Sequence, residues 1–248
     1  MLSDADLSRR GAETLLASWE AYARGATGGA VQRLPGVAVA VFPHEPERAV
    51  FNNALLECDL AAAARAAALA AMEAVYAAAG VARFAAWVHE HDAPLRADLE
   101  RRGYTLDTTT RAMGAAIDDI RLPPSELDLA PVDWSTYLRL LGLPAGLLAG
   151  ADHAAFHPLV ARLDGEAVAA ALAFDHRGDC GIYSVGTLEH ARRRGLATAL
   201  TARQAHDARL RGVRTLSLQS TAMAERVYAA VGFRDLGRLL EYVPPTPS

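Results

Sequence analysis

Residues 189–202 read EHARRRGLATALTA, in which three consecutive arginines stand directly before Gly195 and a stretch that favours a helix. The first N–H groups of a helix have no intrahelical partner, and the helix dipole adds partial positive charge at that end. Gly195 allows a ligand to approach the backbone closely, Ala197 leaves the first turn unobstructed, and arginines add charge-assisted hydrogen bonds. The pattern therefore predicts a cradle for a diphosphate, with a solvated basic turn as the alternative.

A second group of candidate residues lies downstream, in a predicted helix over 222–231 and the turn that follows it. Ala224, Tyr228, Gly232 and Phe233 stand at the spacing A-x-x-x-Y-x-x-x-G-F. The phosphate-binding pattern GxxxxGK[ST] and the dinucleotide pattern GxGxxG are both absent. Tyr228 is therefore a candidate for chemistry beside the basic turn, with a packed helix aromatic as the alternative.

Together the two motifs resemble those of the GNAT superfamily, the acetyl-CoA-dependent N-acetyltransferases. The family motif R-x-x-G-x-[GA] stands here as Arg192 to Ala197, and the tyrosine motif follows at the expected place. The resemblance covers residues 127–243, and the first half of the chain only in its layout. Two positions depart from the pattern, because Ala197 replaces the commoner glycine and Thr221 stands where the family often has asparagine.

The resemblance implies that acetyl-CoA enters a cleft between two strands that separate, 181–187 and 213–218. The pantetheine arm would pair with the backbone of 185–187, and the diphosphate would lie on the N–H groups of 193–198. The residues expected to bind this co-substrate are Val185, Gly186, Thr187, Arg192, Arg193, Arg194, Gly195, Leu196, Ala197, Thr198 and Thr221.

In the implied reaction an amine attacks the thioester directly and a thiolate leaves. A thiol has a pKa near 8.5 and a tyrosine one near 10, so Tyr228 is expected to act as the general acid. An alkylammonium acceptor with a pKa near 10.4 must first lose a proton. Counted in steps of two back from Thr187, Asp179 is the nearest carboxylate on the same face of the strand, so it is the candidate base. The alternative is that Asp179 lies in a hairpin turn.

These motifs need a particular order of strands and helices to position them. In the second half, sequence patterns predict strands 158–164, 167–175 and 181–187, a helix over 195–211, a strand 213–218, a helix 222–231 and a strand near 238–243. The first half repeats this order, with strands 36–42 and 49–57, a helix 60–79, a strand 82–89, a helix 93–102 and a strand 105–113.

The glycines at helix ends recur in both halves. Gly80 and Gly212 each end a long helix, and Gly103 and Gly232 each end the next helix, which indicates an internal duplication. We therefore predict an α/β fold with mixed sheet, made of two GNAT-like domains. These are a degenerate domain over residues 1–120, a proline-containing linker over 121–127 and a catalytic domain over 128–248.

The first copy lacks both chemical elements. Asp59 would place negative charge where a diphosphate should lie, and Leu99 stands four residues before Gly103, whereas Tyr228 stands four residues before Gly232. We expect the first copy to have no cofactor site and to help shape the substrate pocket.

Composition limits the other function classes. The 248-residue chain has a net charge of −4, so no global basic field favours nucleic acid. The chain has two distant cysteines and no apolar run that could span a membrane, which favours a soluble, cytoplasmic protein. His153 and His157 lack an intervening glutamate and precede Pro158, so no metal site is expected.

The expected partner is a small-molecule primary amine that the sequence does not identify, and a homodimer is compatible with this interpretation. The alternative function is a non-catalytic acyl-CoA-binding sensor or interaction module. A purely structural α/β protein is a third class.

Overall fold

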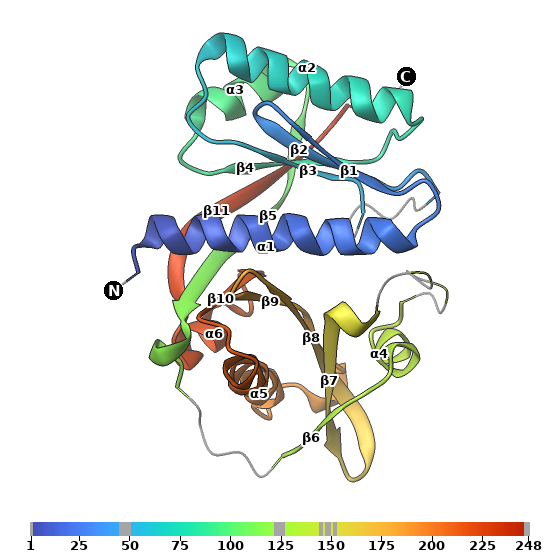
Figure 1. Ribbon diagram of the computed structural model, residues 1–248, viewed down its shortest axis with the longest axis vertical. Helices are drawn as coiled ribbons and strands as arrows, with labels where there is room; N and C mark the ends of the chain where they lie inside the picture. Colours follow the sequence, from blue (N-terminus) through green and yellow to red (C-terminus); the bar gives the residue numbers. More distant parts are fainter. Residues whose placement is uncertain are drawn as a thin grey trace. The chain divides into compact units, whose positions relative to one another are not determined.

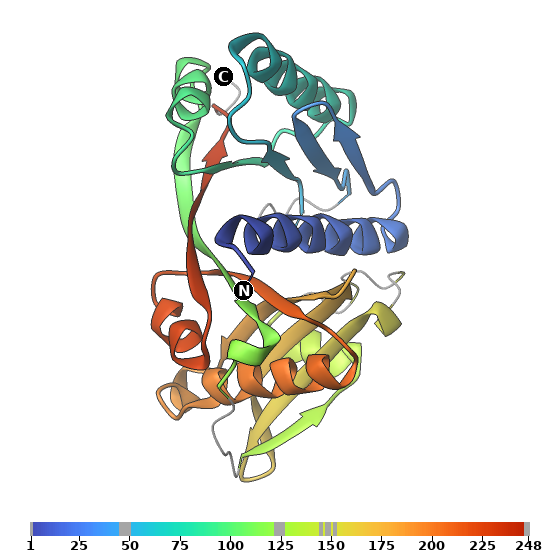
Figure 2. The ribbon, with the colours of Figure 1, turned by 60° about the vertical axis from the view of Figure 1, so that its left-hand side comes forward.

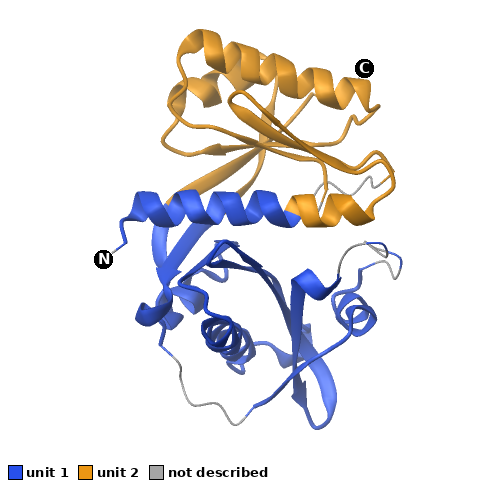
Figure 3. Ribbon diagram, viewed as in Figure 1, with its two compact units in different colours: residues 1–18, 111–236 blue, residues 19–110, 237–248 orange. Residues whose placement is uncertain are grey.

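The computed structural model describes residues 2–44, 51–121, 127–143, 146, 150 and 153–245 (Figure 1). The chain forms two compact units, which Figure 3 colours separately. Unit 1 contains residues 1–18 and 111–236, and unit 2 contains residues 19–110 and 237–248. The domain boundaries at 120 and 128 stay a prediction, and most of the predicted linker, residues 122–126, lies outside the described residues.

Three elements pass from one unit into the other. They are helix α1 (Asp4–Gly25) and the strands β5 (Thr105–Ala116) and β11 (Arg234–Val243). In unit 1, residues 111–116 of β5 pair antiparallel with β10, and in unit 2, residues 239–242 of β11 pair antiparallel with β4. The last strand of each half of the sequence therefore completes the sheet of the other half.

Unit 2 holds most of the first half of the sequence. Its elements are β1 (Ala30–Leu34), β2 (Val37–Val41), β3 (Asn53–Leu56), α2 (Ala62–Ala78), β4 (Ala85–His89) and α3 (Ala93–Arg101). Its core packs apolar residues of α2 and α3 against alternate residues of β2, β3 and β4, with Leu69, Met72 and Leu95 fully buried. Strand alternation places this apolar face on one side of the sheet.

Unit 1 holds the predicted functional motifs. Its elements are the 3-10 turn η1 (Ile117–Asp119), β6 (Asp128–Pro131), α4 (Trp134–Leu140), η2 (His153–Ala155), β7 (Phe156–Leu163), β8 (Glu166–His176), β9 (Asp179–Thr187), η3 (Glu189–Ala191), α5 (Leu196–Leu210), β10 (Thr215–Ser220) and α6 (Glu225–Val231). Helix α5 packs on β7, β8 and β9, and its length across these strands is clear in Figure 2. Alanines of β8 at positions 169, 171 and 173 allow the helix to lie close to the sheet.

The eleven strands lie in the order β1-β2-β3-β4-β11-β5-β10-β9-β8-β7-β6. Most neighbours are antiparallel, and each unit contains one parallel pair, β3 with β4 and β9 with β10. The predicted mixed α/β fold is confirmed.

The sequence predicted most of these elements but not all. Of the predicted strand 49–57, the described part forms a strand over Asn53–Leu56 only. Helices α1 and α4 and the strands β1 and β6 were not predicted, because their polar residues blur the apolar periodicity. Among the described residues, no helix is long and apolar enough to cross a membrane.

Candidate functional site: the end of β9 and the start of α5

The basic turn lies between β9 and α5, where the chain turns sharply. Arg193 and Gly195 both have positive φ angles, 64° and 77°. A β-carbon added to Gly195 would meet nothing within 4 Å, so this position is open as well as left-handed. The loop therefore leads the chain into α5 and leaves free space at its first turn.

The first turn of α5 presents unpaired N–H groups. The amide of Ala199 donates to the carbonyl of Gly195 at 3.0 Å, which is the first bond of the helix. Gly195 caps the helix without a side-chain hydrogen bond. Within the described part of the chain, the N–H groups of residues 196–198 thus remain available to an anion.

The three arginines surround this turn and are exposed. Arg192 donates from Nε to the carbonyl of Thr187 at 3.4 Å, which ties the turn to the end of β9. No ion pair of Arg192, Arg193 or Arg194 with any described residue occurs. Their charge is not neutralised by the fold and is available to a ligand.

Strands β9 and β10 separate at a defined point. They pair in parallel from Asp179 and Thr215 only as far as Gly181 and Ser217, although β9 continues to Thr187 and β10 to Ser220. Beyond this point β9 pairs with β8 on its other edge, up to Ala169 opposite Thr187. Among the residues that the structure describes, the edge of β9 that faces β10 is therefore open over 182–187, as an added strand would require.

A β-bulge lies in this open part of β9. Ala170 pairs with Gly186 but Leu172 pairs with Tyr183, so β9 carries one extra residue there, and Ser184 has a φ of 48°. The bulge turns the backbone of Val185 to Thr187 relative to the rest of the strand. These three residues and the basic turn form one continuous segment.

Tyr228 is buried in a cluster that includes residues of both β9 and β10. It belongs to the same buried cluster as Ile182 and Leu218, the first residues beyond the paired part of β9 and β10. Burial raises the pKa of Tyr228 to about 12, so its phenol is a weaker acid than that of a free tyrosine. Thr221 is exposed just before α6.

Asp179 lies at the opposite end of β9 from the basic turn, as the first residue of the strand rather than in the hairpin turn. Its side chain is 2% exposed. It accepts hydrogen bonds from Thr215 Oγ1 at 2.6 Å and Ser217 Oγ at 2.7 Å. Burial raises the pKa of Asp179, and the hydroxyl donors and Arg10 offset this only in part. The structure does not bring Asp179 to the cradle.

The corresponding loop of unit 2 is closed by its own side chains. Asp59 has a φ of 59°, and its amide donates to Oδ2 of the buried Asp92 at 2.9 Å. The other oxygen of Asp92 accepts from the amide of Leu95 and caps α3. Carboxylates occupy the place where unit 1 presents free N–H groups and arginines.

Helix α4 supports the bulge of β9, and sequence patterns did not reveal this role. Tyr137 is buried, and burial raises the pKa of its phenol to about 12. A hydrogen bond with Ser184 opposes this rise in part. A β-carbon on Gly186 would lie 2.7 Å from Leu141, so α4 packs directly on the strand. Trp134 stacks on His153 with ring centroids 5.0 Å apart.

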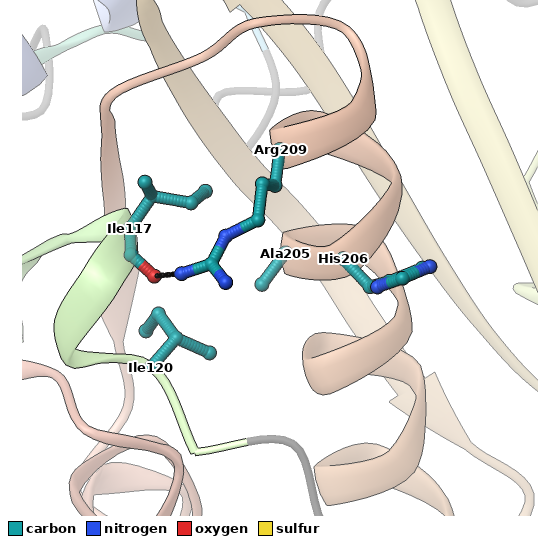
Figure 4. Close-up of a pocket in the computed structure, with 5 residues that line it drawn as sticks. All are labelled: Ile117, Ile120, Ala205, His206 and Arg209. Carbon is teal, nitrogen blue, oxygen red and sulfur yellow. Dashed lines mark hydrogen bonds between the residues drawn. The ribbon is translucent and has the colours of Figure 1, made fainter.

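A shallow depression beside α5 is a poor candidate for a ligand site. It is lined by Ile117, Ile120, Ala205, His206 and Arg209 and has an open volume of about 150 Å³ (Figure 4). That volume includes open solvent and encloses no room for a water molecule, so the depression does not hold a small-molecule ligand. Arg209 donates to the carbonyl of Ile117 at 2.6 Å, so it has a structural role there.

Comparison with known families agrees with this geometry. Residues 121–233 match the model of the Acetyltransferase (GNAT) family. The second half of the chain is a GNAT domain. The match spans the basic turn, the parallel pair β9–β10 and Tyr228, so it includes every element of the candidate site.

Solved structures extend the likeness to the whole chain. A GCN5-related N-acetyltransferase from Kribbella flavida superposes with a TM-score of 0.75 at 19% identity, over 96% of this chain and 95% of that one. A GCN5-related N-acetyltransferase from Sphaerobacter thermophilus gives 0.63 at 17% identity, over 96% and 87%. A tandem GNAT protein from the clavulanic acid biosynthesis pathway gives 0.60 at 15% identity, over 100% and 98%.

These identities are low and show the fold alone. No curated protein matches the sequence. The predicted membership in the GNAT superfamily and the tandem arrangement are confirmed, whereas the individual site residues stay predictions.

Proposed function

We propose that unit 1 is an N-acetyltransferase that transfers the acetyl group of acetyl-CoA to a primary amine of a small molecule by direct attack. The observation that carries this proposal is the continuity of three features: an open strand edge over 182–187, unpaired N–H groups at 196–198, and exposed arginines between them. An extended arm that ends in a diphosphate needs this arrangement.

The residues present fit acetyl-CoA as a substrate. The N–H groups of Leu196, Ala197 and Thr198 would receive the diphosphate, and the open space at Gly195 would allow its close approach. Arg192, Arg193 and Arg194 would add charge from the side. Val185, Gly186 and Thr187 would bind the arm through their backbone, and exposed Thr221 would offer one polar contact.

In this proposal Tyr228 assists the departing sulfur. The amine lone pair forms the bond to the carbonyl carbon, the carbon–sulfur bond breaks, and the thiolate takes a proton. Transfer from a phenol of pKa about 12 to a thiolate whose acid has a pKa near 8.5 is unfavourable by about 5 kcal/mol. Tyr228 therefore acts mainly as a hydrogen-bond donor to the developing thiolate, and solvent completes the protonation.

Asp179 is not placed to take the amine proton by direct contact. It is 2% exposed and both of its oxygens accept hydrogen bonds from hydroxyl groups. Its role as a base therefore needs an intervening group between its carboxylate and the acceptor.

Unit 2 contributes no second acetyl-CoA site in this proposal. Its loop is occupied by Asp59 and Asp92, and buried Leu99 stands where unit 1 has Tyr228. One active site in a chain of two similar halves follows from these differences.

Thiol release from acetyl-CoA, measured with a panel of primary alkylamines, amino acids and amino sugars, tests the proposal. Acceleration by at least one amine, together with a mass increase of that amine by one acetyl group, is the expected result. Binding of acetyl-CoA without acceleration by any amine would favour the sensor function instead. Absence of binding would leave only a structural role.

A further inference from the structure

A buried polar layer lies between the first half of α1 and the strands β9 and β10. Thr14, Asp179, Thr215 and Ser217 are all at most 3% exposed, whereas most buried residues of the described chain are apolar. Burial of a carboxylate is costly unless hydrogen bonds and charge compensate for it. The layer therefore needs an explanation beyond packing.

Helix α1 approaches this layer closely and brings a positive charge to it. A β-carbon on Gly11 would lie 2.9 Å from that of Ser217, so the helix backbone lies directly on β10. Arg10 and Thr14 face Asp179 from the same helix, and Arg10 stabilises its charged form. The groups that face Asp179 are thus Arg10 and Thr14 from α1 and Thr215 and Ser217 from β10.

Tyr183 lies over the end of this layer that is nearest the open cleft. Its hydroxyl oxygen would be 2.2 Å from a β-carbon on Gly181, so the ring folds back along β9 over this glycine. Gly181 is the register partner of Ser217, the last pair before β9 and β10 separate. The phenol oxygen is buried. Adjacent strands lie about 4.8 Å apart, so one water can bridge this oxygen and the Ser217 hydroxyl.

The parallel pair in unit 2 shows that the fold does not need a carboxylate here. The parallel pair β3–β4 can be aligned with β9–β10 by the first residue pair of each. In this alignment Asn53 is equivalent to Asp179, and Trp87 is equivalent to Ser217. Asn53 Oδ1 accepts a hydrogen bond from Trp87 Nε1 at 3.1 Å, in the same diagonal arrangement. The unit without a cradle holds a neutral pair, and the unit with the cradle holds a buried charge.

We propose that Tyr183, Ser217 and Asp179 form a relay that takes up the proton of the acceptor ammonium group. This inference rests on the proposed acetyltransferase function. Tyr183 touches the acceptor, and Ser217 and Asp179 act through it. The ammonium proton passes to the Tyr183 oxygen as the Tyr183 proton passes through one water to Ser217 and the Ser217 proton to Asp179 Oδ2. The reaction leaves a neutral amine and a protonated Asp179, which returns its proton to solvent after turnover.

A matched pair of substitutions separates this relay from a structural role. Ser217→Ala and Thr215→Val each remove one buried hydroxyl that donates to Asp179, but only Ser217 lies on the side of the cleft. Tyr183→Phe removes only the phenol oxygen and keeps the ring over Gly181. We expect Ser217→Ala and Tyr183→Phe to lower kcat/KM for an alkylamine at pH 7 by about 10²-fold, and Thr215→Val by less than about 3-fold.

A relay and a structural defect differ in how the loss of kcat/KM depends on pH and on the pKa of the acceptor amine. A structural defect would give the same loss for every amine and pH. An amine whose conjugate acid has a pKa below 7 arrives neutral, so the deficits of Tyr183→Phe and Ser217→Ala should shrink to less than about 5-fold with it. The same deficits should also shrink for alkylamines as the pH approaches 10.

The relay would be overturned if Ser217→Ala and Thr215→Val lost equal activity. It would also be overturned if the Tyr183→Phe deficit were the same for all amines and pH values. In both cases the acetyltransferase function would still stand. If Ser217→Ala does not fold, the Tyr183→Phe comparison alone decides. If the wild-type protein transfers acetyl to no amine, the proposed function and the relay both fail.

Discussion

The ring of Tyr228 packs edge-on against that of Phe233, with centroids 6.1 Å apart and planes at 69°. This contact orients the ring of Tyr228 from within α6, in the buried cluster that also contains Ile182 and Leu218. The orientation comes from the ring, not from the oxygen, so removal of the oxygen leaves the packing intact.

Tyr228→Phe should therefore lower kcat by about 10²-fold without weakening acetyl-CoA binding. Steady-state kinetics and calorimetry of the same preparation measure the two effects. Because burial raises the pKa of Tyr228 to about 12, the phenol keeps its proton across the working range. The wild-type protein should show no loss of kcat between pH 8 and 10 from this residue, and a loss that disappears in Tyr228→Phe would contradict the assignment.

Two substitutions at Gly195 should differ sharply. A β-carbon meets no atom there, so Gly195→Ala has only the strain of a positive φ, about 1 kcal/mol of unfolding free energy. Gly195→Glu adds bulk and negative charge at the N–H groups of 196–198 and should abolish acetyl-CoA binding. Calorimetry compares the two variants, with Gly195→Ala as the control for folding.

The three arginines should contribute less than the backbone. Their side chains are exposed, so each single change to alanine should weaken acetyl-CoA binding by about 3- to 10-fold, and less at high salt. Titration at two salt concentrations measures this. A single arginine whose loss equals the effect of Gly195→Glu would show that a side chain, not the helix terminus, is the main ligand.

Arg211 should matter for stability rather than for activity. It donates to both oxygens of Asp175, at 2.5 and 2.9 Å. Burial raises the pKa of Asp175, but the hydrogen bonds from Arg211 outweigh it, so the net shift is downward. The stabilisation is therefore present above about pH 4 and is lost as the pH falls through the lowered pKa.

Arg211→Met should reduce the unfolding free energy at pH 7 by about 2 kcal/mol, and the reduction should fade at acidic pH. Arg203→Met is the matched control, because Arg203 pairs with Asp207 within one helix and should contribute no more than about 0.5 kcal/mol. Denaturant titrations at pH 7 and pH 3 distinguish the two.

Asp179→Asn should not destabilise the protein at neutral pH. Burial raises the pKa of Asp179, so the folded state holds its proton more tightly than the unfolded chain. The stability that this group provides is present below its unfolded pKa and is lost as the pH rises through the raised folded pKa. We expect an equal or higher melting temperature for Asp179→Asn at pH 7, with lower turnover, and a clear fall in melting temperature would indicate a structural role.

The fold class and the helix start at Gly195 could be predicted from the sequence. The order of strands and helices around Gly195 and Gly232 follows local patterns, and the N–H groups of a helix start need no tertiary information. The exchange of β5 and β11 between the two halves could not be predicted, because it depends on pairing between residues far apart in the chain.

The polar layer beside β9 was missed for the same reason. Arg10 and Thr14 lie in a helix whose polar residues look solvated in sequence, and their proximity to Asp179 arises only when α1 packs on β10. Asp179 itself was considered for a turn because it follows Gly178, yet its buried position gives it two hydroxyl donors instead. The signal that could have found this layer is the alternation of small polar residues, Thr215 and Ser217, with the apolar Leu216 and Leu218 in one strand.

The central claim is that this tandem fold holds a single acetyl-CoA site, at the turn before α5. Calorimetric titration of the full chain with acetyl-CoA tests it most directly. We expect a stoichiometry of one per chain, and we expect Gly195→Glu to abolish this binding. Two sites per chain, or binding that survives Gly195→Glu unchanged, would contradict it.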